Sequence, residues 1–528
     1  MFTSEQAWVF LTPSRLLSKW YQEWGAQEES ETSEPKIEAK PIVSMAYGAS
    51  FINQIRAALW NDPMVQRGYD DNKEGMFKMP FFGRWATIVT GRYVEELAKA
   101  PDNYLSFQET INDVSAHLHE IRRITYQVLQ MMQLELLIGP ALSRDQIHLP
   151  AIRALTRRLS VVFPEIVDET HSAFATQMEK GKIADGWISI KAFDAFSDLI
   201  SQLHHRAFVG LPLCRDEKWN KTMVKSATEL TIRALLLRPF PESRRADANE
   251  YMKNYGRMLE EGVNLLMPLL EQRRAVPEDE RPVHQNDLLT IIMSCVSEEE
   301  PDPKAIIGTF LLVDQVAQGT THMTFMHALY YIVTHPEYVE ELREEVQLVN
   351  GDGPLAYRSL EHLHKLDSFL RETQRLSGLS NFSMIRVALQ DFEFSNGVKI
   401  PKGETVMAIG NPVHHDSDVY EDPLEFKPFR FSERAQAEAL GKGSKQYDMI
   451  TPSPQFLAWG LGRHACPGRW YASMVVKHLM VYIITKYDVK LPDSAKGKRP
   501  ADWNIMGSCV PNMTTQVLFK RRDDVDWE

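Results

Sequence analysis

The chain is poor in cysteine and contains no long apolar run, and each shortage excludes a class of protein. Its 528 residues include four cysteines, with no C-x-x-C pair and no zinc-site spacing. We expect no disulfide framework in so long a chain, and therefore a reducing, intracellular compartment. No stretch reaches the roughly 18 to 20 apolar residues that a transmembrane helix requires, and no secretory signal is visible.

Positive charge is also in short supply. The net charge of −12 argues against a nucleic-acid-binding protein, while the 44% hydrophobic content suffices for a sizeable core. Residues 1–40 form a separate N-terminal segment in which 27–40 is an acidic, polar linker. Within that segment, 16–24 is either a short piece that rests on a membrane surface or a locally packed helix. From Pro41 onward the sequence is typical of a globular protein.

The most informative stretch runs from Trp459 to Arg469 and contains Cys466 among several glycines. Glycines let a loop approach a flat cofactor closely, because they carry no side chain. We expect Pro467 to be the first residue of the helix that follows, where its missing N–H costs nothing. The free N–H groups of a helix start favour an anion, and a thiolate held there suits haem iron.

Two other interpretations of this loop are weaker. Gly460 to Ala465 also fits the dinucleotide pattern G-x-G-x-x-G/A, which requires a strand before it and an acid about 20 residues later. Pro452 and Pro454 make a poor strand, and the nearest downstream acid, Asp488, lies too far along. A merely structural buried cysteine would leave the density of glycines unexplained.

The loop resembles the haem-binding loop of the cytochrome P450 family. The family places an aromatic residue, a glycine, a basic residue, the cysteine and a second glycine at fixed positions. Those positions are filled here by Trp459, Gly462, His464, Cys466 and Gly468. The resemblance extends over about 41–522. It implies a single catalytic domain, 41–528, of mainly α (α+β) class, with long helices and small peripheral sheets around a buried haem.

Two further segments resemble the family in the expected order. Glu372 and Arg375 form an E-x-x-R pattern in the helical stretch 366–376, where residues three apart share a face. Taken alone, that pattern is equally typical of a surface ion pair. The segment 426–431 resembles the family's F-x-P-x-R-F, whose arginine completes a buried Arg–Glu–Arg cluster. The resemblance therefore joins Arg430 to Glu372 and Arg375, and breaking such a cluster is costly.

A third segment, 316–321, resembles the oxygen-binding groove of the family, although an ordinary buried helix would also fit it. The resemblance makes Thr320 and Thr321 the catalytic candidates, with Thr320 on the oxygen side. Gly319 stands where the family usually has an acid that helps to bring protons to dioxygen. Our hypothesis is that Thr320 and ordered water do this instead. Other polar candidates on the same helix are Asp314, Gln315, Gln318 and a water resting on Gly319.

The haem propionates require donor groups. The resemblance makes His464 the first candidate and Arg386, in a strand beyond the E-x-x-R helix, the second. The alternative for Arg386 is a surface strand position. His148 or Arg153, in the helix around 148–157, would be a further donor. The family usually has a tryptophan in this helix, and that tryptophan is missing here. Trp459, Gly462 and Gly468 are expected to contact the haem as members of the cysteine loop.

The implied function is a haem-thiolate monooxygenase that resembles members from the secondary metabolism of filamentous fungi. Its cofactor would be haem b, reduced by NADPH through NADPH–cytochrome P450 reductase at the cytosolic face of the endoplasmic reticulum. A basic face for that reductase is expected from Arg463, His464, Arg469 and Lys477. One alternative is a haem-thiolate isomerase or dehydratase that does not use dioxygen. The other is a haem-binding sensor without catalysis.

The substrate is expected to be a hydrophobic small molecule such as a terpenoid, a polyketide or an alkaloid. The segments that would face it are 102–116, 206–240, 313–320, 379–382 and 506–510. The hydrophobic pattern predicts helices at 150–179, 218–236, 250–274, 304–334, 336–348 and 467–486. Strands are predicted at 384–389, 392–394, 398–400, 405–408 and 515–520, with a hairpin turn at Asn396–Gly397.

Overall fold

Long helices make up most of the protein. The computed structural model describes residues 40–41, 61–81, 84–107, 147–226, 257–276, 286–296, 303–351, 353, 355–438, 445–505 and 507–522. The longer helices are α11 (His148–Thr156), α12 (Leu159–Glu179), α13 (Ala192–Phe208), α16 (Arg257–Ala275), α17 (Leu288–Cys295), α18 (Pro303–Thr334), α19 (Val339–Asn350), α20 (His364–Leu376) and α23 (Arg469–Lys486). Shorter ones are α5 (Asn61–Asp70), α6 (Tyr93–Lys99), α21 (Asn411–His414) and α22 (Arg430–Ala437).

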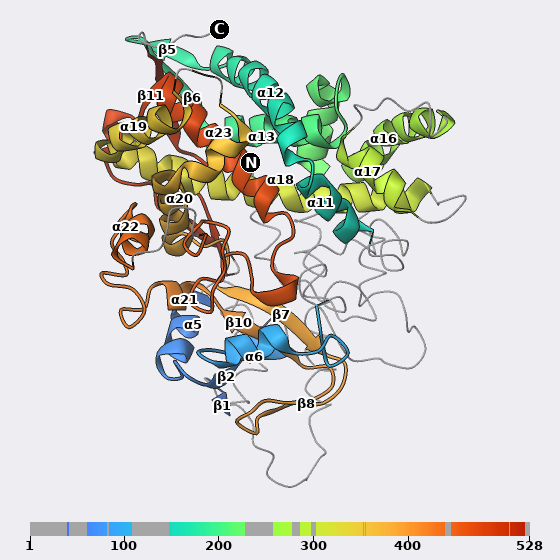
Figure 1. Cartoon of the computed structure of the whole chain (residues 1–528), viewed down its shortest axis with the longest axis vertical. Coiled ribbons are helices and arrows are strands. Elements are labelled where there is room, and N and C mark those ends of the chain that lie inside the picture. Colours follow the sequence, from blue (N-terminus) through green and yellow to red (C-terminus); the bar gives the residue numbers. More distant parts are fainter. Residues whose placement is uncertain are drawn as a thin grey trace, which may run out of the picture.

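The strands form small sheets at the periphery. The six-stranded sheet has the order β1 (Lys40–Pro41), β2 (Met76–Phe81), β3 (Arg84–Val89), β10 (Thr405–Ile409), β7 (Phe382–Ala388), β4 (Leu105–Ser106). The four-stranded sheet has the order β11 (Tyr487–Lys490), β14 (Gln516–Arg521), β6 (Trp187–Lys191), β5 (Lys182–Ala184). Two hairpins pair β8 (Phe392–Glu393) with β9 (Lys399–Ile400), and β12 (Trp503–Ile505) with β13 (Ser508–Val510). Figure 1 shows most of the long helices at one end of the molecule, and the six-stranded sheet with α5 and α6 at the other.

The main apolar core lies where α12, α13, α18 and α23 pack together. The ring of Phe196 on α13 lies 4.8 Å from that of Phe325 on α18, and Phe174 on α12 lies 5.8 Å from Phe196. Helix α18 is buried on most of its sides, as expected for a helix in the centre of a large domain. Its middle is an exception, because Val316 is 46% exposed and Thr320 is exposed as well. The central helix therefore has one open stretch, at the segment predicted to form a groove.

Most predicted helices are confirmed with small changes of boundary. The 150–179 segment is divided by a turn between α11 and α12, and 336–348 begins with a 3-10 turn before α19. The prediction that Pro467 begins a helix is wrong, because α23 begins at Arg469 with Gly468 as its N-cap residue. The physical reason is local: the amide groups of Gly468 and Arg469 turn towards the sulfur of Cys466.

Several elements were not predicted from the sequence, notably α13, α17, the β2–β3 and β5–β6 hairpins and β11. The Asn396–Gly397 turn between β8 and β9 is confirmed, with Gly397 at φ +82°. Predictions for 1–39, 108–116, 227–240, 250–256 and 506 fall outside the described residues. All four cysteines are free. Among the helices of the described ranges, none has the length and apolar character needed to cross a membrane.

Candidate active site

Hydrogen bonds from the backbone and from Trp459 hold the cysteine loop in place. The amide of Cys466 donates to the carbonyl of Trp459 at 2.8 Å, and the indole of Trp459 donates to the carbonyl of Met449 at 2.6 Å. Gly462 has φ +73°, and a Cβ there would lie 3.0 Å from the carbonyl oxygen of Ala98 on α6. That position therefore requires glycine for both its conformation and its space.

The sulfur of Cys466 lies in a partly buried position that suits an anion. Burial raises the pKa of the thiol, while hydrogen bonds from the amides of Gly468 and Arg469 and the charge of Arg469 lower it. Backbone N–H groups directed at a sulfur are what a bound thiolate needs. The guanidinium of Arg469 also donates to the carbonyl of Cys466 at 2.7 Å and stacks 3.6 Å above the ring of Trp470.

A cavity joins this loop to the open stretch of α18. Thr320, Thr321 and Thr324 line it from α18, and Ala458 and Trp459 line it from the start of the cysteine loop. Its remaining walls come from His327, Thr373, Gln374, Ser377, Gly378, Leu379, Ala472 and Val476. The structure thus brings Thr320, Thr321 and Trp459 to the wall of one cavity.

The middle of α18 leaves room beside its backbone. A Cβ added at Gly319 would meet no atom within 4 Å in the described structure. The hydroxyl of Thr320 donates to the carbonyl of Val316 at 2.8 Å, so its oxygen lone pairs stay available as acceptors. The structure therefore leaves space beside the backbone of Gly319 for a group of the size of a water molecule.

Arg386 and His464 lie around the ring of Phe107. The guanidinium of Arg386 is 5.1 Å above that ring, and the His464 imidazole is 5.4 Å from it. Arg386 is only 3% exposed, and in the described residues it has no ion pair within 4 Å. Burial lowers its pKa to about 10. A buried cation of this kind fits a propionate, so the surface alternative for Arg386 is wrong.

His464 has a protein partner that the sequence did not suggest. Its Nε2 lies 2.6 Å from Oδ1 of Asp102, which had been placed among the substrate-facing residues. Burial lowers the pKa of His464, and the hydrogen bond to Asp102 opposes this shift. His148 lies at the start of α11, which packs against α17 and α18. In the described ranges, no hydrogen bond or ion pair joins His148 or Arg153 to the cysteine loop.

Glu372, Arg375 and Arg430 form a closed ionic cluster. Arg375 donates to Glu372 through Nε and Nη2, both at 2.8 Å, and the side chains of this pair are fully buried. Arg430 donates from Nε to both oxygens of Glu372 at 3.1 and 3.2 Å. The predicted three-residue cluster is therefore present, and the alternative of a surface pair is wrong.

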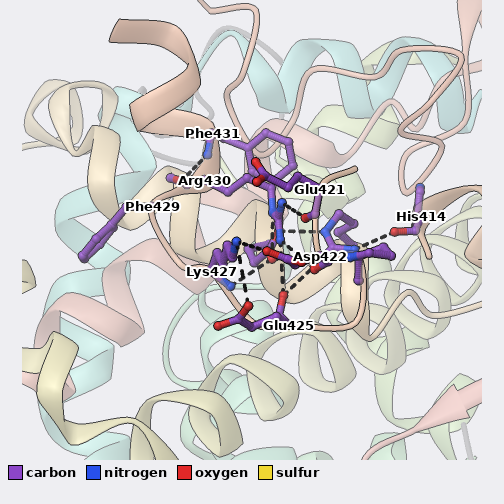
Figure 2. A network of polar contacts seen from close by, with 12 residues as sticks. His414, Glu421, Asp422, Glu425, Lys427, Phe429, Arg430 and Phe431 are labelled. Carbon is purple, nitrogen blue, oxygen red and sulfur yellow. Dashed lines mark hydrogen bonds and ion pairs between the residues drawn. The ribbon is translucent and has the colours of Figure 1, made fainter. Parts of the chain in front are cut away.

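The same cluster fastens the chain segment that follows α21. Arg375 donates to the carbonyls of His414 and Pro423. Arg430 donates to those of Asp422 and Glu425, and Figure 2 shows these three residues together. The amide of Lys427 donates to Glu372 at 3.1 Å. Two arginine side chains thus pair with a single carboxylate, and their other N–H groups donate to backbone carbonyls. This arrangement fixes 414–431 on α20.

One member of the predicted basic face lies inside the protein. Lys477 is 6% exposed and pairs with Asp367 of α20, and its ammonium also donates to the carbonyl of Leu360 at 3.0 Å. The prediction that Lys477 belongs to a docking face is therefore wrong. It points inward because α23 is buried on several sides and Asp367 offers a partner. Arg463 is half exposed, and Arg469 is partly buried against Trp470.

A second polar group, which the sequence did not indicate, reaches the wall of the cavity through His327. His327 of α18 lies 3.2 Å from the carbonyl of Cys509 and 3.0 Å from Nη2 of Arg499. Nη1 of Arg499 donates to Asp502 at 2.9 Å. His327, Asp502 and Cys509 have the spacing of a metal site. The guanidinium already supplies the positive charge there, so this group instead fastens the β12–β13 hairpin to α18.

The chain matches the model of one protein family. The cytochrome P450 family model matches residues 146–519. Cytochrome P450 monooxygenase 71 of Postia placenta is 32% identical over 479 residues, covering 90% of this chain and 91% of the relative. Cytochrome P450 monooxygenase paxP of Penicillium paxilli is 28% identical over 472 residues, covering 87% and 85%.

A solved structure shows the same fold. The retinoic acid-bound cyanobacterial CYP120A1 superimposes with a TM-score of 0.67 at 16% identity, covering 92% of this chain and all of that one. A helical domain with a glycine-rich cysteine loop facing a central helix defines the haem-thiolate class of fold. This chain belongs to the cytochrome P450 family. The predicted family, fold class and oxidoreductase activity are confirmed.

Proposed function

We propose that this protein is a monooxygenase that holds haem b through the Cys466 thiolate and oxidises a hydrophobic small molecule. The observation that carries the proposal is the position of Cys466. Its sulfur receives backbone N–H groups in a loop whose Trp459 shares a cavity with Thr320. When bound, haem with a thiolate ligand supplies the cleavage of dioxygen and the transfer of one oxygen atom to a C–H bond.

The residues of the chain have separate tasks in this proposal. Cys466 supplies the anionic ligand, and Arg386, assisted by His464, binds the propionates. Thr320 accepts a hydrogen bond from water in the room beside Gly319, and this water carries protons to the reacting side. Val316 and Leu379 present apolar surface to a substrate. Terpenoids, polyketides and alkaloids of fungal secondary metabolism fit such a surface.

Electrons would come from NADPH through NADPH–cytochrome P450 reductase. Arg463 and Arg469 beside the cysteine loop support this proposal, because they place positive charge on a chain whose net charge is −12. A reductase of this kind is bound to the endoplasmic reticulum, so we propose that this protein acts at the cytosolic face of that membrane. Attachment through the N-terminal segment is part of the same proposal.

Dioxygen consumption tests the function directly. The purified haem-loaded protein, mixed with the reductase and candidate substrates, is expected to consume dioxygen and NADPH together and to form an oxygenated product. Incorporation of one atom from labelled dioxygen would establish monooxygenation. Turnover of substrate without dioxygen would instead support the isomerase or dehydratase, and haem binding without any turnover would support the sensor. Metabolite profiling of a deletion strain would identify the substrate.

Thr320→Ala is expected to uncouple the enzyme. Loss of the hydroxyl removes the water acceptor in the groove, so NADPH oxidation continues while product per NADPH falls by about tenfold and peroxide rises. The measurement compares product, peroxide and NADPH in one reaction. Thr334→Ala is the matched control, since Thr334 also donates to the carbonyl four residues earlier, at 2.7 Å, but lies outside the cavity. Unchanged coupling in Thr320→Ala would refute this role.

Arg386→Met is expected to weaken haem retention without unfolding the protein. Methionine fills much of the same space, so the buried site loses its charge while the packing is largely kept. We expect haem transfer to apomyoglobin to accelerate by about tenfold or more, the loss of one charge-assisted hydrogen bond. Arg463→Met provides the control with a half-exposed arginine. Equal transfer rates for wild type and Arg386→Met would show that Arg386 does not hold a propionate.

A further inference from the structure

Two charged side chains of α20 hold the peptide bond between Asp448 and Met449 from opposite sides. The carbonyl of Asp448 accepts a hydrogen bond from Nη1 of Arg371 at 2.5 Å. The amide of Met449 donates to Oδ1 of Asp367 at 3.1 Å. Asp367 and Arg371 are one helical turn apart and therefore lie on the same face of α20. We call these two side chains the α20 clamp.

Both members of the α20 clamp are buried, at 3% exposure for Asp367 and 2% for Arg371. Asp367 pairs with Lys477 of α23. Burial lowers the pKa of Arg371 to about 10, so it remains a cation near neutral pH. Its guanidinium lies 3.8 Å above the ring of Phe456 and also donates to the carbonyl of Thr451 at 2.7 Å. Hydrogen bonds to ionised groups are about twice as strong as those between neutral groups, so the clamp fixes this peptide bond firmly.

The clamped peptide leads directly to the cysteine loop. The carbonyl of Met449 accepts from Nε1 of Trp459 at 2.6 Å, and the carbonyl of Trp459 accepts from the amide of Cys466 at 2.8 Å. The side chain of Met449 is fully buried, and Trp459 lines the cavity. An unbroken series of hydrogen bonds therefore runs from Asp367 to the backbone of Cys466.

Helix α23 returns to the start of this series. It begins at Arg469, directly after the cysteine loop, and it carries Lys477, which pairs with Asp367. The loop is thus tied to Asp367 at both of its ends, at one through Trp459 and at the other through α23. The indole cannot shift without breaking a hydrogen bond in the interior of the protein. The proposed function gives no role to Asp367 or Arg371.

We propose that Asp367 and Arg371 are positioning residues, which fix Trp459 and through it the place of the Cys466 sulfur before the backbone N–H groups that face it. The proposal rests on the proposed function, in which that sulfur binds haem. Hydrogen bonds to a thiolate ligand stabilise the reduced, more negative state and so raise the reduction potential of the iron. When the α20 clamp is broken, Trp459 shifts and the N–H groups at the start of α23 align less well with the sulfur. The haem then becomes harder to reduce.

Asp367→Leu combined with Lys477→Met removes one half of the α20 clamp. It replaces a buried ion pair with apolar side chains of similar size, so that no charge is left buried without a partner. The midpoint potential of the haem-loaded protein should become more negative, with the equilibrium against a reference redox dye shifted by about fivefold or more. Arg371→Met breaks the other half, because methionine fills much of the same space without donating. It should shift the potential in the same direction.

Exchange of the Trp459 indole N–H with solvent is the second readout. The signal is read in ¹⁵N-tryptophan-labelled protein in its diamagnetic ferrous carbon monoxide form, and it is assigned by its loss in Trp459→Phe. In both clamp variants this N–H should exchange faster by about tenfold or more. Trp219, which is fully buried, is the internal reference and should exchange as in wild type. Equal acceleration at Trp219 would show a general loosening of the fold and would overturn the proposal.

Trp459→Phe tests whether the α20 clamp acts through the indole. Phenylalanine keeps an aromatic ring but has no N–H to donate to the carbonyl of Met449. In this background, Arg371→Met should cause no further shift of the potential, because the last link of the series is already absent. Shifts of the potential that simply add would show that the clamp acts by another route, and the proposal would be wrong.

Lys78→Met combined with Glu404→Met is the matched control. Lys78 and Glu404 form another lysine–carboxylate pair of low exposure, which involves β2 of the six-stranded sheet. Its replacement should leave the potential and the Trp459 exchange unchanged. A shift as large as that of the clamp variants, or an unchanged potential in both clamp variants, would contradict the proposal. If wild type with carbon monoxide showed no thiolate spectrum, the proposed function would fail, while the Trp459 exchange would still report on the clamp.

Discussion

Cys466→Ser is expected to abolish the spectrum of a haem-thiolate protein and all oxygenated product. A serine hydroxyl stays protonated under the conditions in which the cysteine sulfur becomes an anion. The backbone N–H groups of Gly468 and Arg469 would then face a neutral oxygen. The reduced protein with carbon monoxide should therefore lose the absorption band that a thiolate ligand produces.

Cys295→Ser is the matched control for that experiment. Cys295 is a free, partly exposed cysteine at the end of α17, and it does not line the cavity. Its replacement should leave the carbon monoxide spectrum, haem content and product formation as in wild type. A normal thiolate spectrum in purified Cys466→Ser would contradict the site and the proposed function together.

Glu372→Gln is expected to prevent most of the expressed protein from folding into a form that can bind haem. The change keeps the shape of the side chain and removes the one carboxylate between Arg375 and Arg430. Breaking a buried ion pair by neutralising one partner costs about 3–5 kcal/mol, out of a total stability of about 5–15 kcal/mol. Soluble haem-loaded yield should collapse, and any purified protein should unfold at a much lower temperature.

Lys427→Met provides the comparison in the same segment. Lys427 pairs with Asp422 in an exposed ion pair, and such pairs contribute about 0–1 kcal/mol. The haem-loaded yield and the unfolding temperature of Lys427→Met should stay close to those of wild type. If Glu372→Gln unfolded at the wild-type temperature with full haem content, the cluster would not be what holds 414–431 on α20.

The parts of the site that lie close together in the chain could be predicted from the sequence. The cysteine loop is one local segment, so its glycines and Cys466 indicated a ligand before any fold was known. Glu372 and Arg375 are one helical turn apart, which predicts that they pair. Arg430 lies 58 residues from Glu372, and only the family resemblance connected the two.

Burial and distant partners could not be predicted in the same way. Lys477 is 110 residues from Asp367, and nothing in the local pattern shows that this lysine points inward. The bond from His464 to Asp102 spans 362 residues, and the local pattern around His464 does not indicate this carboxylate partner. The sequence shows that a residue is charged, but it does not show which distant residue will pair with it.

The sequence by itself indicated the candidate metal ligand, the family and the central helix, because short-range spacing and hydrophobic periodicity record these features. Only the tertiary structure decided which charged groups are buried and with whom they pair. For example, Nε2 of His205 on α13 lies 3.3 Å from Oδ1 of Asp314 on α18, and both side chains are fully buried. This contact exists only because the two helices pack together. The energy of a charge depends on its solvent and its neighbours, and both are fixed when distant segments pack together.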